Sequence, residues 1–595
     1  MKKRQWVLFL SVALLLFLSA PFSSVYANGW DDPTKLGWKD GEAKRGWIIS
    51  KIRHMTLREK VGQLFMVQVY GSTPRDPRYE ETNLAGNRGG KNFAEVINKY
   101  HIGGVIYYNW NGNIPTPFDP EQVNALSNGI QEIAMNQRMA IPLLISTDQE
   151  GGIVARVRKP AAEFPGNMAL GATRSAEYAR KAAGIMGMEL QNLGLNMNLA
   201  PVLDVNVNPE NPVIGVRSFS SNPDLVSKLG VAQVKGYQSQ NIIATAKHFP
   251  GHGDTDVDSH SGLPIINHDW ETLWNVDLKP FREAIDAGIG AIMTAHIVVP
   301  ALDDSGLPAT LSKPILTGLL REKLGFDGII ITDALGMGAL NILPPDSVPS
   351  VIALKAGADI LLNPPNFPRA YNAVLDAVKS GEISKKRLNE SVYRILRAKM
   401  KRGLFEDPYT DPDAVEQIYS PEHHQLAAEI TNKSITMVKN ANELLPLEEG
   451  QKVLVTGPSA GKPDMLSDLL DSKGIDASAY ATNSSPTSGQ AATAVEKAED
   501  ADVVLVTAYT ANTNAAQQRF VKALVDTGKP VAVASMRNPY DLAVFPEVDA
   551  NVLTYGNQDV SVKALARVLA GEVNPSGKLP VAIPGQREYG FGLSY

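Results

Sequence analysis

The sequence predicts an α/β protein in which a barrel of eight parallel strands, alternating with helices, precedes a smaller layered α/β domain. Three observations predict this fold. Short apolar runs alternate with amphipathic stretches over about residues 65–366, eight of these runs have the composition of buried strands, and a shorter series of the same kind follows toward the C-terminus. Such alternation is typical of a parallel sheet. Eight units in about 300 residues favour a (β/α)8 barrel of the TIM type over the alternative, a doubly wound open sheet.

Before the barrel, the N-terminus has the pattern of an export signal. A basic start, MKKR, precedes an apolar run over residues 6–20, and VYA at residues 25–27 has the small-x-small form that a signal peptidase cuts. A membrane anchor is the alternative, but a run of about 15 residues is shorter than the roughly 20 needed to span a bilayer. We therefore expect residues 1–27 to be a signal peptide, and the mature protein to have no integral membrane segment.

Composition narrows the compartment and the partners. The 595 residues carry a formal net charge of −6, and removal of the three basic residues of the signal makes it about −9. An acidic chain lacks the basic surface that nucleic-acid binding requires, so we expect no nucleic-acid partner. The chain has no cysteine, which excludes disulfides, thiolate metal sites and a lipid-modified cysteine. We expect a secreted or cell-wall-associated protein that is not a lipoprotein.

Eight apolar runs are the expected strands of the barrel. They are LFMVQVY (64–70), IGGVIYY (102–108), IPLLIST (141–147), LNMNLAPVLDV (195–205), NIIATAKHF (241–249), AIMTAHIVV (291–299), GIIITDA (328–334) and ADILLN (358–363). Helical patterns lie between most of them, for example over residues 121–139, 176–193 and 280–287. With a last helical pattern at 384–405, the barrel domain is expected to span residues 28–405.

A linker and a second domain are expected after the barrel. Residues 406–431 are rich in proline and charge, which is typical of a connecting segment. The second α/β series then has strand-like runs at 452–457, 502–509, 530–536 and 550–556, separated by helical stretches. We expect the second domain to span residues 432–595.

Polar residues stand where the predicted barrel strands end. They are Asp148 after the third run, Asp204 after the fourth, Lys247 and His248 in the fifth, His296 in the sixth, Asp333 in the seventh and Asn363 in the eighth. Each residue alone could cap its own loop. The carboxyl ends of all barrel strands meet on one face, however, and six such strand ends favour a shared polar pocket.

The stretch KHFPGHGDTDVDSHSGLP (247–264) contains three of the nine histidines. A zinc site is one interpretation, but the spacing is uneven and no HExxH helix pair is present, so we expect no metal. Asp258 and His260 are two residues apart and in extended backbone would project to the same side. A carboxylate bonded to one imidazole nitrogen leaves the other to exchange protons near neutral pH, which favours an acid/base dyad. We expect structural roles for His252 and His296.

Four motifs of the barrel region carry a family resemblance. KHFPGHGDTDVDSH, STDQEGG (146–152), NPVIGVRSF (211–219) and ITDALGM (331–337) resemble glycoside hydrolase family 3, and specifically its β-N-acetylglucosaminidase branch. NPYDL (538–542) and the terminal YGFGLSY (589–595) resemble the C-terminal α/β sandwich domain of that family. The resemblance covers most of the mature chain and implies a barrel followed by a sandwich domain.

The resemblance also implies roles for individual residues. Asp333 matches the nucleophile that forms a covalent glycosyl-enzyme, and His260 matches the acid/base residue, with Asp258 as its partner. Further positions match residues that hold the hydroxyls of the terminal sugar: Asp148, Arg156, Arg217, Lys247 and His248. No cofactor is implied. Retaining glycosidases commonly use two carboxylates, so a histidine here replaces one of them.

Three functions are consistent with these features. The favoured one is a retaining exo-β-N-acetylglucosaminidase that removes terminal β-linked N-acetylglucosamine (GlcNAc) from peptidoglycan fragments, acting as a monomer on wall saccharides or muropeptides. The second is a β-glucosidase or β-xylosidase of the same family, in which the acid/base carboxylate commonly comes from the second domain and the Asp-x-His dyad would be idle. The third is a non-catalytic module that binds wall sugars, which would not need both Asp333 and the dyad.

Overall fold

The computed structural model describes residues 41–344 and 346–595, so the predicted signal peptide at residues 1–27 lies outside the described residues. The chain divides into two compact units, residues 1–47 and 48–595, and the architecture below is that of the second. Helix α2 spans Glu42–His54. No helix in the described part of the chain is both long and apolar enough to cross a membrane.

Eight parallel strands form the first sheet in chain order. They are β1 (Phe65–Val67), β2 (Gly104–Ile106), β3 (Leu144–Thr147), β4 (Met197–Asn198), β5 (Ile243–Phe249), β6 (Ala291–Thr294), β7 (Ile329–Ile331) and β8 (Leu361–Leu362). β8 also pairs with β1, and a parallel bridge between Ile331 and Ile360 joins β7 to β8. The sheet therefore closes on itself, which confirms the predicted barrel and excludes the open sheet.

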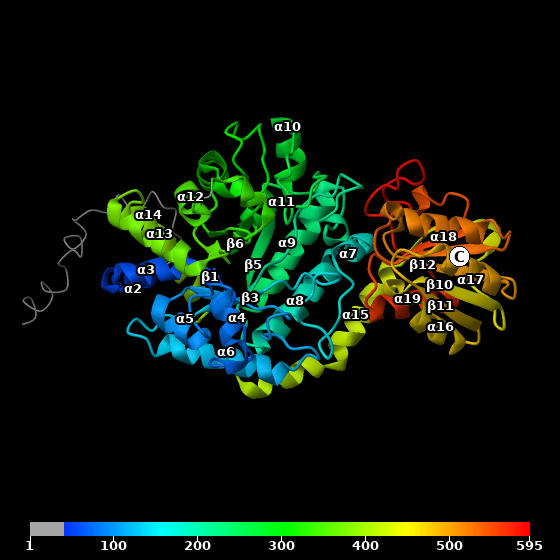
Figure 1. Ribbon diagram of the computed structural model, residues 1–595, viewed down its shortest axis with the longest axis horizontal. Helices are drawn as coiled ribbons and strands as arrows, with labels where there is room; N and C mark the ends of the chain where they lie inside the picture. Colours follow the sequence, from blue (N-terminus) through cyan, green and yellow to red (C-terminus); the bar gives the residue numbers. More distant parts are fainter. Residues whose placement is uncertain (1–40, 345) are drawn as a thin grey trace, which may run out of the picture. The chain divides into compact units, whose positions relative to one another are not determined.

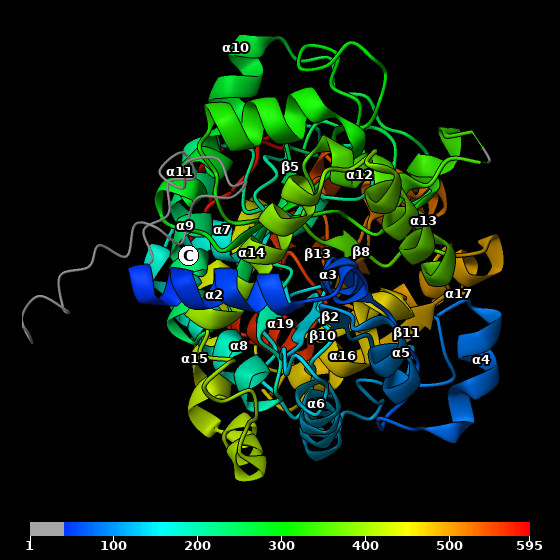
Figure 2. The same ribbon diagram turned by 90° about the vertical axis from the view of Figure 1, so that its left-hand side faces the viewer.

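Helices surround these strands (Figures 1 and 2). The longer ones are α3 (Leu57–Gln63), α5 (Phe93–Tyr100), α6 (Pro120–Met135), α7 (Asn167–Thr173), α8 (Ala176–Asn192), α9 (Pro223–Ser239), α11 (Lys279–Asp286), η7 (Pro314–Lys323), α12 (Pro349–Ala356), α13 (Phe367–Ser380) and α14 (Lys385–Lys401), and the short α4 (Glu80–Ala85) and α10 (Trp270–Thr272) lie in loops. Their starts follow local chemistry. The Asp119 side chain accepts a hydrogen bond from the backbone N–H of Gln122, and Pro120 occupies the first helical position of α6, where its missing N–H is not needed.

The strands are shorter than the apolar runs that predicted them. The run at 195–205 contains only the two residues of β4. Beyond β4 the chain continues to pair with β5, because the N–H of Thr245 donates to the carbonyl of Ala200 at 2.8 Å and the N–H of Leu203 donates to that of Lys247 at 2.7 Å. The apolar run thus continues along the barrel wall although the regular ladder is interrupted.

The segment predicted to be a linker contains two helical elements, η9 (Pro412–Tyr419) and α15 (Pro421–Ser434). Both begin with proline, so the residues that suggested an irregular connection mark helix starts instead. His423 of α15 is buried against α8, with its Nδ1 3.0 Å from Oε1 of Glu189. The connection is therefore packed against the barrel.

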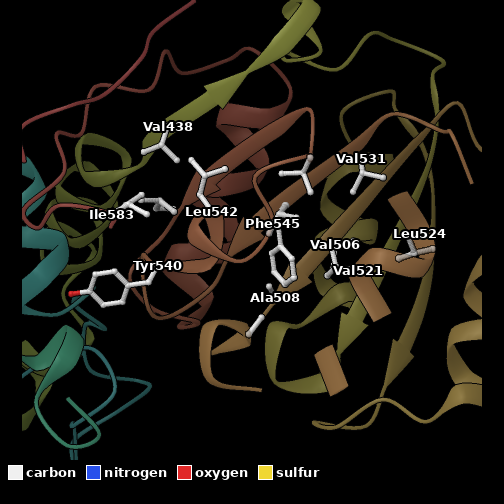
Figure 3. Close-up of a cluster of buried hydrophobic side chains, with 14 of the residues drawn as sticks. Val438, Val506, Ala508, Val521, Leu524, Val531, Tyr540, Leu542, Phe545 and Ile583 are labelled. Atoms are coloured by element: carbon white, nitrogen blue, oxygen red, sulfur yellow. The ribbon is translucent and has the colours of Figure 1, made fainter. Parts of the chain in front are cut away.

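The second domain is built on a six-stranded sheet in the order β11-β10-β12-β13-β14-β9. Its elements are β9 (Thr436–Asn440), β10 (Lys452–Pro458), β11 (Asp476–Thr482), β12 (Val503–Ala508), β13 (Val531–Ser535), β14 (Ala550–Leu553), α16 (Pro463–Asp471), α17 (Ser488–Ala498), α18 (Ala515–Val525) and α19 (Asp559–Leu569). β9 is antiparallel to β14 and the other pairs are parallel. Two apolar clusters pack this domain, and Figure 3 shows part of one of them.

Candidate active site

A cavity of about 330 Å³ opens at the carboxyl ends of the barrel strands. Seven of the eight predicted site residues line it: Asp148, Arg156, Arg217, Lys247, His248, His260 and Asp333. The eighth, Asp258, contacts the cavity through His260. Side chains from distant parts of the sequence therefore meet in one place. Of the residues predicted from the strand ends, Asp148, Lys247, His248 and Asp333 line the cavity, whereas Asp204, His296 and Asn363 do not.

Four charged side chains form one network along the cavity. Lys247 Nζ lies 2.8 Å from Asp148 Oδ1 and 2.9 Å from Glu150 Oε1. Arg217 donates two hydrogen bonds to Glu150, at 2.9 and 2.7 Å. Burial would raise the pKa of Glu150, but Arg217 and Lys247 outweigh it and hold that pKa well below the ordinary value. Burial would likewise lower the pKa of Lys247, yet Asp148 and Glu150 raise it, so Lys247 and Glu150 both stay charged.

His248 is fixed from behind by Asp204. Its Nδ1 lies 2.7 Å from Asp204 Oδ2, and Asp204 Oδ1 accepts hydrogen bonds from the backbone N–H groups of His248 and His252 at 3.1 and 2.8 Å. Although burial acts to raise it, the pKa of Asp204 is lowered, chiefly by His248. An ionised Asp204 holds a proton on Nδ1, so Nε2 of His248 faces Arg217 Nη2 at 3.5 Å.

Asp333 follows β7 and is held as a carboxylate. Burial acts to raise its pKa, but the charges of His248, His296 and Lys247 and the N–H of Ala334 lower it below the ordinary value. The N–H of Ala334 donates to Asp333 Oδ1 at 2.7 Å. An ionised oxygen atom therefore faces the cavity near neutral pH.

Asp258 and His260 form the predicted pair on the loop after β5. Asp258 Oδ1 lies 2.7 Å from His260 Nδ1 and also accepts a hydrogen bond from the His260 backbone N–H at 2.9 Å. The assumption of extended backbone is wrong, because the N–H groups of Ser261 and Gly262 both donate to the Asp258 carbonyl at 3.0 Å and form a turn. The turn brings the side chains together, and His260 lies at the mouth of the cavity with 64% of its side chain exposed.

His252 holds the loop that carries this pair. Its two ring nitrogens lie 2.7 Å from Thr255 Oγ1 and 3.0 Å from Ser259 Oγ, and burial lowers its pKa to about 4. His296 is bonded within the barrel in the same way, with its Nδ1 2.8 Å from Thr310 Oγ1. These contacts agree with the structural roles predicted for both histidines.

His268, which sequence reasoning missed, ties the same loop to the barrel. Its Nδ1 lies 2.7 Å from Asp277 Oδ2 and its Nε2 lies 2.8 Å from Asp254 Oδ2. The hydrogen bond to Asp277, together with Asp254, raises the pKa of His268 to about 9 against the effect of burial. A charged imidazole thus bonds to Asp254 and to Asp277.

Sequence reasoning also missed an aromatic wall of the cavity. The rings of Tyr108 and Trp110 are stacked 4.1 Å apart at 19°. The guanidinium carbon of Arg156 lies 4.8 Å from the centre of the Trp110 ring, and Arg156 Nη2 is 4.0 Å from Asp148 Oδ2. Stacked rings of this kind pack well against the apolar face of a sugar. Their only signal in the sequence is the stretch YYNW (107–110), which begins inside the second strand-like run and extends just beyond its end.

Comparison with known proteins places both parts of the chain in one family. Residues 56–398 match the model of the glycosyl hydrolase family 3 N terminal domain, and residues 435–593 match that of its C-terminal domain. Beta-hexosaminidase A of Pseudoalteromonas piscicida is 36% identical over 559 residues, which cover 82% of this chain and 90% of the relative. The beta-N-acetylglucosaminidase/beta-glucosidase of Cellulomonas fimi is 29% identical over 577 residues, covering 90% of this chain and 95% of the relative.

A solved structure agrees over nearly the same length. The glycoside hydrolase family 3 beta-N-acetylglucosaminidase from Paenibacillus sp. str. FPU-7 superimposes with a TM-score of 0.80 at 37% identity. The match covers 89% of this chain and 99% of that one. The barrel, the second domain and their order in the chain are therefore shared with that protein.

Proposed function

The chain belongs to glycosyl hydrolase family 3, and from this premise we propose that it is a retaining exo-β-N-acetylglucosaminidase acting on peptidoglycan fragments. Family membership makes it a glycoside hydrolase, and its relatives include hexosaminidases. One observation carries the finer assignment. The Asp258–His260 pair lies at the mouth of the cavity into which the Asp333 carboxylate opens.

The proposed reaction has two steps. Asp333 attacks the anomeric carbon and forms a glycosyl-enzyme, while His260 gives a proton to the departing oxygen. His260 then takes a proton from water, which attacks the same carbon and releases Asp333. Each step inverts the anomeric carbon, so the product keeps the β configuration.

Asp258 gives His260 the properties that both steps need. A carboxylate bonded to Nδ1 fixes the tautomer and stabilises the imidazolium form, so that Nε2 exchanges the proton. Burial acts to raise the pKa of Asp258, but the N–H and ring of His260 outweigh it and lower that pKa. Asp258 is therefore ionised throughout the cycle and acts through the orientation and basicity of the imidazole.

The charged network at the cavity fits a sugar rich in hydroxyls. Lys247, Arg217 and Arg156 supply N–H donors, and Asp148 supplies a carboxylate that accepts hydrogen bonds from hydroxyls. Because Glu150 pairs with both Arg217 and Lys247 from behind, these two donors are pre-organised before the sugar binds. No cofactor enters the proposed reaction.

We place the enzyme outside the cell, secreted or associated with the wall. The N-terminal sequence with its basic start, apolar run and VYA site supports export. An exported enzyme of this specificity meets GlcNAc chiefly in wall glycans and their fragments, so terminal GlcNAc linked to N-acetylmuramic acid is the proposed natural substrate.

A panel of substrates tests the proposal. We expect 4-nitrophenyl β-N-acetylglucosaminide to be cleaved far faster than the β-glucoside and the β-xyloside, with no loss of rate in a metal chelator. Release of GlcNAc from a GlcNAc–muramic acid disaccharide tests the natural substrate. Preference for the β-glucoside would favour the alternative glucosidase, and binding of wall sugars without turnover would favour a non-catalytic module.

A further inference from the structure

A second cavity of about 250 Å³ lies between the two domains. One wall is the barrel segment 209–216, and the other consists of Thr510, Thr513, Arg537 and Asn538 of the second domain. Val213 lines both this cavity and the active-site cavity. The two cavities therefore adjoin at Val213.

Arg537 brings a positive charge to the second cavity without a carboxylate partner. Arg537 forms no ion pair with any of the described residues, and its Nε is buried without a hydrogen-bond acceptor. Its guanidinium carbon lies 5.7 Å from the centre of the Tyr509 ring. The other charged residue of the cavity, Glu210, is exposed and forms no ion pair with it. A guanidinium that has no carboxylate partner can bind the carboxylate of a ligand, because its forked N–H donors match the two carboxylate oxygens.

The barrel wall of this cavity is joined to the loop of the proposed acid/base pair. Asn211 donates hydrogen bonds to the carbonyls of His252 and Gly253 at 2.9 and 3.1 Å, and its own Oδ1 accepts the N–H of Val213 at 3.0 Å. In the proposed reaction His260, on that loop, gives its proton to the leaving oxygen. The start of the loop that carries His260 is therefore bonded directly to segment 209–216.

From these observations we infer that the second cavity binds an acidic leaving group, whose carboxylate pairs with Arg537. The inference rests on the proposed function and adds a residue that determines which leaving groups the enzyme prefers. The hydroxyl of Thr513 and the amide of Asn538 line the same cavity and supply further hydrogen-bonding groups. In wall fragments the carboxylate has two sources, the lactyl ether of muramic acid and the attached peptide, and both present the same chemistry to Arg537.

The test compares one neutral and two acidic substrates. Chitobiose has a neutral leaving sugar, and GlcNAc–muramic acid has the free lactyl carboxylate. In the corresponding muropeptide the lactyl carboxyl forms an amide with the peptide, so only the carboxylates of the peptide remain. For Arg537→Gln we expect kcat/KM to fall about tenfold on an acidic substrate, mainly through KM, and less than about twofold on chitobiose. Arg519→Gln is the matched control, since it removes the same charge from an exposed position of α18.

A second variant covers the case in which Arg537→Gln does not fold. Thr513→Glu adds a negative charge to an exposed position at the same cavity and should reduce kcat/KM selectively on acidic substrates. Loss on GlcNAc–muramic acid alone would identify the lactyl carboxylate, and loss on the muropeptide alone would identify a carboxylate of the peptide. Loss on both would show that Arg537 pairs with either one.

Two outcomes would overturn the inference and are distinguishable. In the first, the wild-type protein cleaves aryl β-N-acetylglucosaminide, but the two variants change kcat/KM equally on chitobiose and on the acidic substrates. This outcome would refute the carboxylate site and leave the proposed function intact. No cleavage of aryl β-N-acetylglucosaminide by the wild-type protein would refute the proposed function together with the inference.

Discussion

Asp333 and His260 are held in opposite ways, and this difference determines what their substitution should do. Asp333 is surrounded by positive and polar groups that keep it ionised, and its carboxylate accepts a hydrogen bond from the adjacent N–H of Ala334. His260 is largely exposed and depends on Asp258 for its orientation. We therefore expect the loss of Asp333 to remove chemistry with little effect on folding, and the loss of His260 to act on the two reaction steps unequally.

Asp333→Ala should abolish turnover while the fold is retained. Without the carboxylate no glycosyl-enzyme forms, so the rate on an aryl β-N-acetylglucosaminide should fall at least about a thousandfold. Circular dichroism and the Tm should stay close to those of the wild type. Asp304→Ala, at an exposed loop position, is the control. Near-normal rates in the Asp333 variant would exclude it as the nucleophile.

His260→Ala should slow the hydrolysis of natural disaccharides by about a hundredfold or more, because their leaving groups need a proton. An activated aryl N-acetylglucosaminide should still form the glycosyl-enzyme. This intermediate should accumulate because no base activates water, and stopped-flow measurements should show a burst of the released phenol. Azide should partly restore turnover and give a β-configured adduct. Asp258→Asn should show a milder form of the same defect.

A wild-type rate of His260→Ala on a natural disaccharide would contradict this role. The acid/base group would then have to be another residue, such as a carboxylate from the second domain.

At the scale of elements, the loop after β5 connects the dyad to the barrel. His252 bonds to Thr255 and Ser259 within the loop, and His268 joins Asp254 of the loop to Asp277. The loop is thus held by two histidines in different states. His252, with a pKa near 4, is neutral, and His268, with a pKa near 9, is charged at neutral pH.

The charged state of His268 predicts a pH dependence of stability. Its pKa in the folded protein is raised above the unfolded value of about 6.5, so its contribution is fully present below that pH and is lost as the pH rises through about 9. The difference in Tm between the wild type and His268→Gln should therefore be largest below pH 6.5 and vanish above about pH 9. His54→Gln, at an exposed position at the end of α2, is the control.

A Tm difference that is constant across this pH range would show that His268 acts through packing and not through its charge. Since His268 supports the loop, its variant should also raise KM or lower kcat at neutral pH, by roughly tenfold. The control variant should change neither quantity.

The sequence was informative for elements whose side chains are uniformly buried. All eight barrel strands were predicted because each is an apolar run, and four strands of the second domain for the same reason. β11 was missed because its residues are partly exposed at the edge of the sheet, and β9 because its antiparallel position next to β14 depends on the folded chain.

The site shows the same division between local and long-range information. Asp333 and Lys247 were predicted because they end apolar strands, and Asp258 and His260 because they are close in sequence. Contacts between distant segments could not be predicted in this way. The ion pair of Glu150 with Arg217 and the stacking of Arg156 on Trp110 depend on distances that only the closed barrel sets.

For the whole molecule, the second domain packs against the part of the barrel that carries Arg217. Asn206 donates a hydrogen bond to the Tyr540 hydroxyl at 3.0 Å, and the N–H of Ser221 donates to the Pro580 carbonyl at 3.1 Å. Figure 3 shows Tyr540 with its hydroxyl directed away from the other labelled side chains of its cluster. The segment 206–221, which includes the sugar-binding candidate Arg217, is therefore supported from both ends by the second domain.

Gly171 of α7 lies where this segment and the second domain meet, and it provides the test of that support. A Cβ added to Gly171 would lie 1.9 Å from the carbonyl oxygen of Phe219 and 3.1 Å from Cβ of Pro580. Because displacing the backbone carbonyl of Phe219 is energetically costly, Gly171→Ala should lower the free energy of unfolding, measured in urea, by about 3 kcal/mol. It should also raise KM for an aryl β-N-acetylglucosaminide, because Phe219 is two residues from Arg217.

Gly184→Ala is the matched control, since the same substitution in α8 meets no atom within 4 Å. A helix interior prefers alanine, so this variant should be more stable by about 0.5–1 kcal/mol and should keep the wild-type KM. If Gly171→Ala lost stability but kept its KM well below its unfolding temperature, the second domain would stabilise the barrel without positioning the sugar site. A parallel change in both quantities would mean that the domain contact sets the geometry around Arg217.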